Sequence, residues 1–353
     1  MATGSEDRAP GPPAHDLASR RHDDLHTPGD PVRLDTPDGP AWVLRRRADI
    51  RAAYTDPRLS PCPRHAAGGD YRGYDLPPEF RDNIISAEPA DHRRVRPLVV
   101  ALMDRAAAAR LAPSLRAVAD DVLARAGGEF DAVADFAGPY VAEAVAGWIG
   151  LPAQPRAAYL AWAATIAGPG WQRVRARDTL PGMLATVRAL DEAAAGTVAH
   201  VLLAHRAAGR ISAGETSAML FYLLYVWFEV CVDAIAEALA GPGDLDQALA
   251  AHAPQVTAFR RFATHDVDLG GTTIRAGQSV LYSLRAAGVD GPDRGHLAFG
   301  HGPHRCPGEP VARALVEEAV AAARRAGVTV GTGGCVRTNG LRTDGLRRLR
   351  ATR

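Results

Sequence analysis

The residues best suited to chemistry in this 353-residue chain lie in one short loop, which reads Phe-Gly-His-Gly-Pro-His-Arg-Cys-Pro-Gly from Phe299 to Gly308. A cysteine ligates a metal as a thiolate, whose charge must be partly neutralised and shielded from water. Glycines at 302 and 308 would let the backbone turn tightly, so that amide N–H groups point at the sulfur of Cys306. Phe299 would cover that sulfur, and a helix beginning near Glu309 would place its positive end beside it. The loop therefore predicts a protected thiolate ligand at Cys306.

Two other readings of the loop are open. His301, His304 and Cys306 could be three ligands of a zinc site, or the loop could be a glycine-rich turn with a structural cysteine. A zinc site would want a fourth ligand close by and has no use for Phe299 or for the helix that follows. The pattern favours the thiolate reading over both.

The loop matches the heme-thiolate signature F-x-x-G-x-H-x-C-x-G at every fixed position, and it resembles the cysteine-ligand loop of cytochromes P450. The resemblance extends from about residue 42 to the C-terminal strands. It implies a mainly α fold with one large helical part and a small β part. It also implies heme b as the cofactor, with Cys306 as the proximal iron ligand, in a loop where Phe299, Gly302 and Gly308 surround the cofactor.

Four further residues are expected to bind the heme propionates. The segment 87–96 resembles the start of the family's C helix, where a histidine and an arginine four residues later bind propionates; here these are His92 and Arg96, which share one helix face. Arg261 leads a segment that looks like the family's strand after the K helix. His304, two residues before the cysteine, matches another common propionate partner. Buried anions need such paired donors.

The pattern fails on the distal side, opposite Cys306. Oxygen-activating relatives carry a central helix with Ala-Gly, an acid and a threonine, and the matching helix here is expected at 214–239. Its corresponding residues keep the acid as Glu229 but lack the small pair and the alcohol. Trp227 or Phe228, where glycine is expected, should fill the oxygen groove, and Val230 cannot relay a proton. We expect a distal pocket lined by residues 227–230, including Phe228, by the loop 71–85 and by the strand 282–286, with Glu229 as the candidate for proton transfer unless an arginine pairs with it.

The family's E-x-x-R pair is also missing, because its positions fall near Gln247 and Ala250, and the connection 287–296 is shorter than in relatives. We therefore expect a trimmed and atypical version of the fold. Three functional readings stay open. The chain is a monooxygenase that hydroxylates with substrate or water as proton relay; or it catalyses a different reaction, such as isomerisation, dehydration, peroxide use, nitrogen-centred bond formation or cyclisation; or it binds heme without catalysis.

Composition narrows the class of protein. The net charge of +1 gives no bulk attraction to nucleic acid or to an anionic membrane. All 41 basic side chains are arginine, which excludes a Schiff-base lysine and a Walker A loop. The four cysteines stand far apart, which argues against a disulfide framework and fits a cytoplasmic protein. We expect a small-molecule substrate from bacterial specialised metabolism.

The order of elements predicts one domain over 31–353 after a disordered segment 1–30 that has no signal-peptide core. A hairpin at 31–43 and a short helix at 47–54 come first. Helical spacing follows over 91–122 and most of 130–240, where the apolar run 218–228 is too short for a membrane span and indicates a core helix. Strand-like stretches are expected at 262–274 and 279–284 with a Gly270-Gly271 turn, and a helix is expected at 309–326. A ferredoxin-like electron donor would dock on the proximal face, near the arginines 93, 94, 305 and 313.

Overall fold

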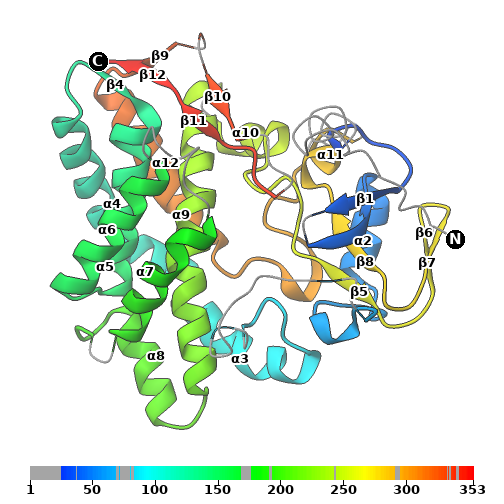
Figure 1. Ribbon diagram of the computed structural model, residues 1–353. Coiled ribbons are helices and arrows are strands. Elements are labelled where there is room, and N and C mark those ends of the chain that lie inside the picture. Colours follow the sequence, from blue (N-terminus) through cyan, green and yellow to red (C-terminus); the bar gives the residue numbers. More distant parts are fainter. Residues whose placement is uncertain are drawn as a thin grey trace, which may run out of the picture.

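The computed structural model describes residues 25–36, 38–68, 71, 80, 83–167, 176–190, 193–241, 244–290, 295–331, 333, 335–338 and 342–353. Helices form the larger part of the molecule, and a smaller part built on β-strands lies beside them (Figure 1). The predicted mainly α class with a small β part is confirmed.

The helical part surrounds one long central helix, α9, which spans Ala213–Ala240. Its start is set by a capping box, because Ser212 accepts from the Glu215 N–H while the Glu215 side chain accepts from the Ser212 N–H. The other helices are α3 (Pro89–Leu102), α4 (Arg105–Arg125), α5 (Gly138–Ile149), α6 (Ala153–Ala167), α7 (Ala176–Arg188), α8 (Val198–Ala207), α10 (Leu245–Ala251) and α12 (Glu309–Arg325). A turn of π-helix, Ala132–Ala137, leads into α5.

The β part is centred on a five-stranded sheet of order β1-β2-β8-β5-β3. Its strands are β1 (Val32–Thr36), β2 (Gly39–Leu44), β3 (Leu59–Ser60), β5 (Arg261–Ala263) and β8 (Ser279–Tyr282), and only the β2–β8 pair is parallel. The helices α2 (Arg47–Thr55) and α11 (Leu284–Val289) pack beside this sheet. The hairpin β6–β7 (Val267–Leu269, Thr272–Ile274) turns at Gly270, where φ is +56°. Short strands β4 (Glu129–Asp131), β9 (Thr329–Val330), β10 (Val336–Arg337), β11 (Leu346–Arg348) and β12 (Arg350–Thr352) bring the C-terminus back onto the helices.

Two hydrophobic clusters fill these two parts. The larger joins the buried faces of α3 to α9 and α12, and the smaller joins α2, α11 and the five-stranded sheet. Within the described chain α9 is the one helix long and apolar enough to cross a membrane, but 78% of its most apolar window is buried inside the protein. It is therefore the core helix that its composition predicted.

Most predicted elements are present with shifted ends. The expected helix at 91–122 is two helices, since Met103 leaves helical geometry and Asp104 caps α4 by accepting from the Ala107 N–H. The predicted disordered segment 1–30 extends too far toward the C-terminus, because Leu25 is buried against the sheet and its carbonyl accepts from the Ser283 hydroxyl. Residues 1–24 lie outside the described residues.

Candidate functional site

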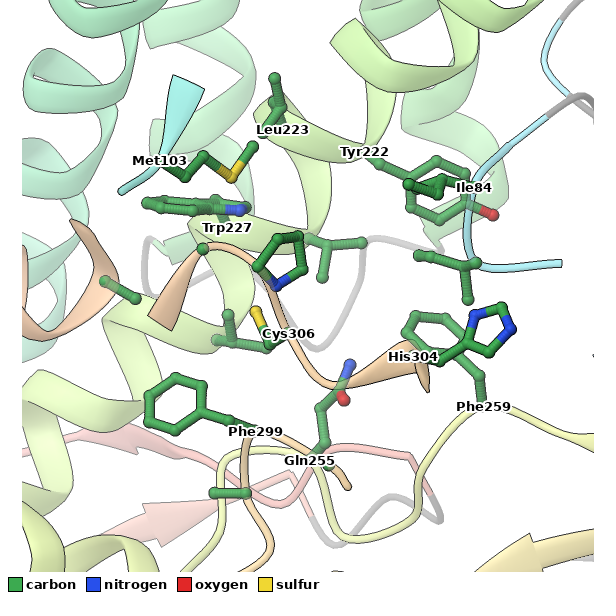
Figure 2. Close-up of a pocket in the computed structure, with 18 of the residues that line it drawn as sticks. Ile84, Met103, Tyr222, Leu223, Trp227, Gln255, Phe259, Phe299, His304 and Cys306 are labelled. Atoms are coloured by element: carbon green, nitrogen blue, oxygen red, sulfur yellow. The ribbon is translucent and has the colours of Figure 1, made fainter. Parts of the chain in front are cut away.

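A large cavity lies where the two clusters meet. Its volume is about 250 Å³. The loop 298–308 forms one wall and α9 another, and α3, the segment 254–259 and Leu284 at the start of α11 close the sides. Figure 2 shows Cys306 inside it, with Met103 and Trp227 at one end and His304 at the other.

The Cys306 loop has the tight backbone that its glycines predicted. Gly302 has φ +68°, and a Cβ there would lie 3.0 Å from the carbonyl oxygen of Tyr54. The Cys306 N–H donates to the carbonyl of Phe299 at 2.8 Å, which closes the loop. Phe299 is half-buried beside it and lines the cavity.

The surroundings of the sulfur favour the neutral thiol over a free thiolate. Burial raises the pKa of Cys306, and the N–H groups of Gly308 and Glu309 and the guanidinium of Arg96 only partly oppose it. The thiol therefore stays protonated unless a cation sits against the sulfur, and coordination of a metal ion is what deprotonates such a group. Because α12 begins at Glu309, its N–H groups face the sulfur as predicted.

Gly308 is required for a reason that sequence reasoning missed. Its φ of −83° is open to any residue, so no special backbone conformation needs glycine there. Instead, a Cβ at position 308 would lie 2.4 Å from Cζ2 of Trp227 and 3.2 Å from the sulfur of Met103. The indole also packs on Trp148, with ring centroids 4.7 Å apart. The loop and α9 thus meet at Gly308 through Trp227.

The four expected propionate ligands converge on the cavity. The rings of His92 and His304 lie against each other with centroids 4.0 Å apart and planes tilted by 36°, and Arg96 and Arg261 line the same cavity. Burial and the nearby arginines lower the pKa of His92, and they lower that of His304 to about 3. Nε2 of His92 is buried, and no described residue forms a hydrogen bond with it.

This cluster lacks counter-ions of its own. Within the described chain, neither Arg96 nor Arg261 forms an ion pair with a carboxylate; each donates to a backbone carbonyl, of Arg305 and Arg260 respectively. Buried cations without anions are costly, so the cluster fits a bound group that brings carboxylates. A heme, whose propionates would meet these four residues while its iron meets Cys306, satisfies both demands.

The zinc reading does not hold in the structure. His304 lies against His92, whereas His301 faces the ring of Tyr54 at 6.5 Å. Among the described residues, no group of three His, Cys, Asp or Glu side chains is placed to hold a metal ion. A site of His301, His304 and Cys306 is therefore wrong, while a heme needs only the cysteine from the protein.

The predicted distal wall is half right. Trp227 and Val230 line the cavity, as do Val226 and Cys231. Phe228 does not, because it is fully buried against Trp162 on another face of α9. Of the predicted loop 71–85, Ile84 and Ile85 line the cavity, and 72–79 and 81–82 lie outside the described residues; of the strand 282–286, Leu284 alone does so.

Glu229 also points away from the cavity. Its carboxylate forms an ion pair with Arg342 of the C-terminal segment. Its placement in the pocket was wrong, because one residue along a helix turns a side chain by about 100°. A role in proton transfer stays a prediction.

Glu229 belongs to an acidic face of α9 that the sequence reading missed. Asp233, one turn on, lies 3.4 Å from Arg347, and Glu237, two turns on, pairs with Arg337 at 2.6 Å. Ion pairs at Glu229, Asp233 and Glu237, which are four residues apart on one face of α9, thus hold the C-terminal segment to this helix. The spacing was visible in the sequence, but the arginine partners lie more than 90 residues away.

The missing E-x-x-R pair is replaced by a contact between α10 and α12. Gln247 and Ala250 make no ion pair, as expected, but their neighbour Asp246 accepts from Arg313 at 2.6 Å and pairs with His296 at 3.0 Å. Arg313 also pairs with Glu309. The cysteine loop is therefore braced from both its ends.

The predicted basic surface is largely neutralised. Arg94 pairs with Asp91 and Glu215, and Arg305 and Arg313 pair with Glu309. Arg93 is exposed and forms no ion pair among the described residues. The net positive charge of this surface is thus smaller than four arginines imply.

No family model matches the chain. It is 31% identical over 323 residues to the vitamin D(3) 25-hydroxylase of Pseudonocardia autotrophica, covering 80% of each chain. It is 27% identical over 328 residues to cytochrome P450 107B1 of Saccharopolyspora erythraea, covering 79% of this chain and 80% of that one. Among solved structures, the tirandamycin C-bound P450 monooxygenase TamI matches with a TM-score of 0.79 at 22% identity, over 96% of this chain and 97% of that chain.

Proposed function

The chain belongs to the cytochrome P450 family and is an enzyme of the P450 monooxygenase type, and we propose that it is a heme-thiolate oxidoreductase of bacterial natural-product metabolism with Cys306 as the iron ligand. One observation carries this proposal. One cavity holds Cys306, whose thiolate form needs a bound cation, and two arginines, Arg96 and Arg261, that pair with no carboxylate among the described residues. Heme b supplies both partners in one molecule.

Each residue around the cofactor has a distinct task in this proposal. Cys306 ligates the iron, and the N–H groups of Gly308 and Glu309 stabilise the thiolate charge. Phe299 keeps water from the sulfur. His92, Arg96, Arg261 and His304 bind the propionates. When bound, the heme supplies the redox centre at which dioxygen or peroxide is activated.

The side chains that α9 turns to the cavity include no carboxylate that could deliver a proton. The face that α9 turns to the cavity carries hydrocarbon, thioether, indole and thiol groups and one phenol. These belong to Met219, Tyr222, Leu223, Val226, Trp227, Val230, Cys231 and Ala234. None of the carboxylates of α9 is on that face, and Glu229 is held by Arg342. A proton must then come from the substrate, from water or from another wall.

The second candidate function rests on the same observation. An enzyme whose α9 delivers no proton to the cavity suits a reaction that does not need one there, such as isomerisation, dehydration, peroxide use, nitrogen-centred bond formation or cyclisation. Trp227 and Val230 would then act by shaping the cavity and excluding water. A third candidate, heme binding without catalysis, has no specific support.

We also propose that a ferredoxin-like partner donates electrons if the enzyme is a monooxygenase. Arg93 is the arginine of the proximal face that remains for an acidic carrier, and the paired arginines nearby would contribute less. We further propose that residues 31–353 act as one domain and that the enzyme works in the cytoplasm, supported by the burial of α9.

Heme reconstitution tests the central claim. The purified protein should take up heme and show a red-shifted thiolate band with carbon monoxide after reduction, and Cys306→Ala should lose that band while keeping its helical circular dichroism. Material that stays colourless, or a spectrum that Cys306→Ala leaves unchanged, would refute the proposal.

Turnover separates the two enzyme candidates. Turnover of an added substrate that requires ferredoxin, its reductase and NADPH supports monooxygenation. Turnover without reductant, or with peroxide alone, supports the second candidate.

A further inference from the structure

One hydroxyl group in the wall of the cavity has no role in the proposed function. It belongs to Tyr54, the last residue but one of α2, whose side chain lines the cavity. The ring of Tyr54 contacts other rings, and within the part of the chain that the structure describes its hydroxyl forms no hydrogen bond. This O–H group is therefore available to a molecule in the cavity.

The ring of Tyr54 is packed between β8 and the cysteine loop. The ring of Tyr282 lies edge-on against it with centroids 4.6 Å apart, and the Tyr282 hydroxyl donates to the carbonyl of Ala53 at 3.2 Å. On the side of the loop, a Cβ at Gly300 would lie 3.5 Å from the Tyr54 hydroxyl, which is an ordinary contact distance. Because the ring is held from two sides, its hydroxyl meets the cavity at a fixed point.

The hydroxyl of Tyr54 also lies near the cations of the cavity. Burial raises the pKa of this phenol, so it stays protonated and can donate, while the guanidinium of Arg261 acts in the opposite direction from within electrostatic reach. Arg261 is itself buried and pairs with no carboxylate among the described residues. The phenol therefore lies on the side of the cavity where a carboxylate of the ligand is expected.

A carboxylate that pairs with Arg261 would have room for a further donor. Its two oxygens offer about four acceptor positions, and a guanidinium fills about two of them. A phenol beside the guanidinium can fill another position without adding a positive charge. That matters here because the cavity wall already carries two arginines and two histidines close together, and one more buried cation would be costly.

We propose that the hydroxyl of Tyr54 donates a hydrogen bond to a heme propionate, so that Tyr54 is a fifth propionate-binding residue. This inference rests on the proposed function, because it assigns one more residue to the same cofactor. Tyr54 then fixes the propionate that pairs with Arg261 and slows the release of heme.

Heme loss from Tyr54→Phe tests this inference, with Tyr282→Phe as the matched control. Each variant removes one hydroxyl and keeps the ring, and the two rings touch, but the Tyr282 hydroxyl is already bonded to the backbone. The heme-loaded proteins are mixed with excess apomyoglobin. Tyr54→Phe should lose heme about 10-fold faster than the wild type, since one charge-assisted hydrogen bond is removed, and Tyr282→Phe should change the rate less than about 2-fold.

Resonance Raman spectroscopy adds a readout that a merely structural role would not move. The bending band of a heme propionate shifts when the propionate loses a hydrogen bond. The band should therefore shift in Tyr54→Phe and stay in place in Tyr282→Phe.

These outcomes separate the inference from the proposed function. An unchanged rate of heme loss or an unmoved propionate band in Tyr54→Phe would each overturn it, and so would equally fast heme loss from Tyr282→Phe. In all of these cases the heme content and thiolate band of the wild type stay normal. A wild type that takes up no heme overturns the proposed function, and this inference with it.

Discussion

Replacing Gly308 by alanine should destabilise the protein through one defined contact. The new Cβ would lie 2.4 Å from Cζ2 of Trp227, where ordinary carbon contacts need at least about 3.5 Å, so the two groups must separate by about 1 Å. Trp227 cannot yield freely, because it is buried and packs on Trp148. Overpacking of this kind costs about 1–3 kcal/mol.

A double-mutant cycle isolates that contact. Trp227→Leu removes the obstructing ring, so Gly308→Ala should cost less than about 1 kcal/mol in that background, and the coupling energy should be about 1–2 kcal/mol. Urea unfolding followed by circular dichroism measures each of the four proteins. Gly331→Ala is the matched control, because its Cβ would meet nothing within 4 Å; it should change stability by less than about 0.5 kcal/mol.

The same substitution should disturb the heme site. Gly308 follows Cys306 by two residues, so a loop pushed away from α9 moves the N–H groups that face the sulfur. The Gly308→Ala protein should therefore take up less heme, and Trp227→Leu should restore uptake. An equal cost of Gly308→Ala in both backgrounds, with no recovery of heme, would show that the Trp227 contact is not why glycine is needed.

Three further predictions concern charged residues. Burial raises the pKa of Asp233 from 3.8 to about 7, so the protonated carboxyl stabilises the fold below pH 4 and this contribution is lost as the pH rises to about 7. The free energy of unfolding should therefore fall by about 4 kcal/mol over that range. In urea titrations, Asp233→Asn should abolish this fall. Arg261→Leu should lose heme to apomyoglobin about 10-fold faster, because a charge-assisted bond to a propionate is removed, and an unchanged rate would exclude Arg261 from that role. Glu229→Gln should lower the melting temperature in the wild type and lower it much less in an Arg342→Met background, whereas lost turnover at full stability in Glu229→Gln would favour its predicted role in proton transfer.

Local pattern was sufficient to predict much of this protein. The loop from Phe299 to Gly308 predicted a buried cysteine with backbone donors, because both the turn and the following helix are short-range features. His92 and Arg96 could be placed on one helix face by their spacing alone. The long apolar helix and the β6–β7 turn at Gly270 followed from periodicity and turn chemistry in the same way.

The distal wall could not be predicted, because it depends on helix rotation. A one-residue change in the alignment of α9 turns a different set of side chains to the cavity, and the sequence alone does not fix how the helix is rotated about its axis. Packing of Phe228 on Trp162 and the pairing of Glu229 with Arg342 turned both residues out of the cavity. Tyr54 reaches the cavity because two segments distant in the sequence, β8 and the cysteine loop, hold its ring.

The sequence by itself thus determined the cysteine loop, the helix-face pair that serves it and the mainly helical class, since each depends on residues within a few turns of one another. Tertiary structure alone decided which face of α9 meets the cavity, why Gly308 must lack a side chain and which arginines remain unpaired. These depend on contacts between residues about 65 to 210 positions apart, and their geometry exists only once the core has packed.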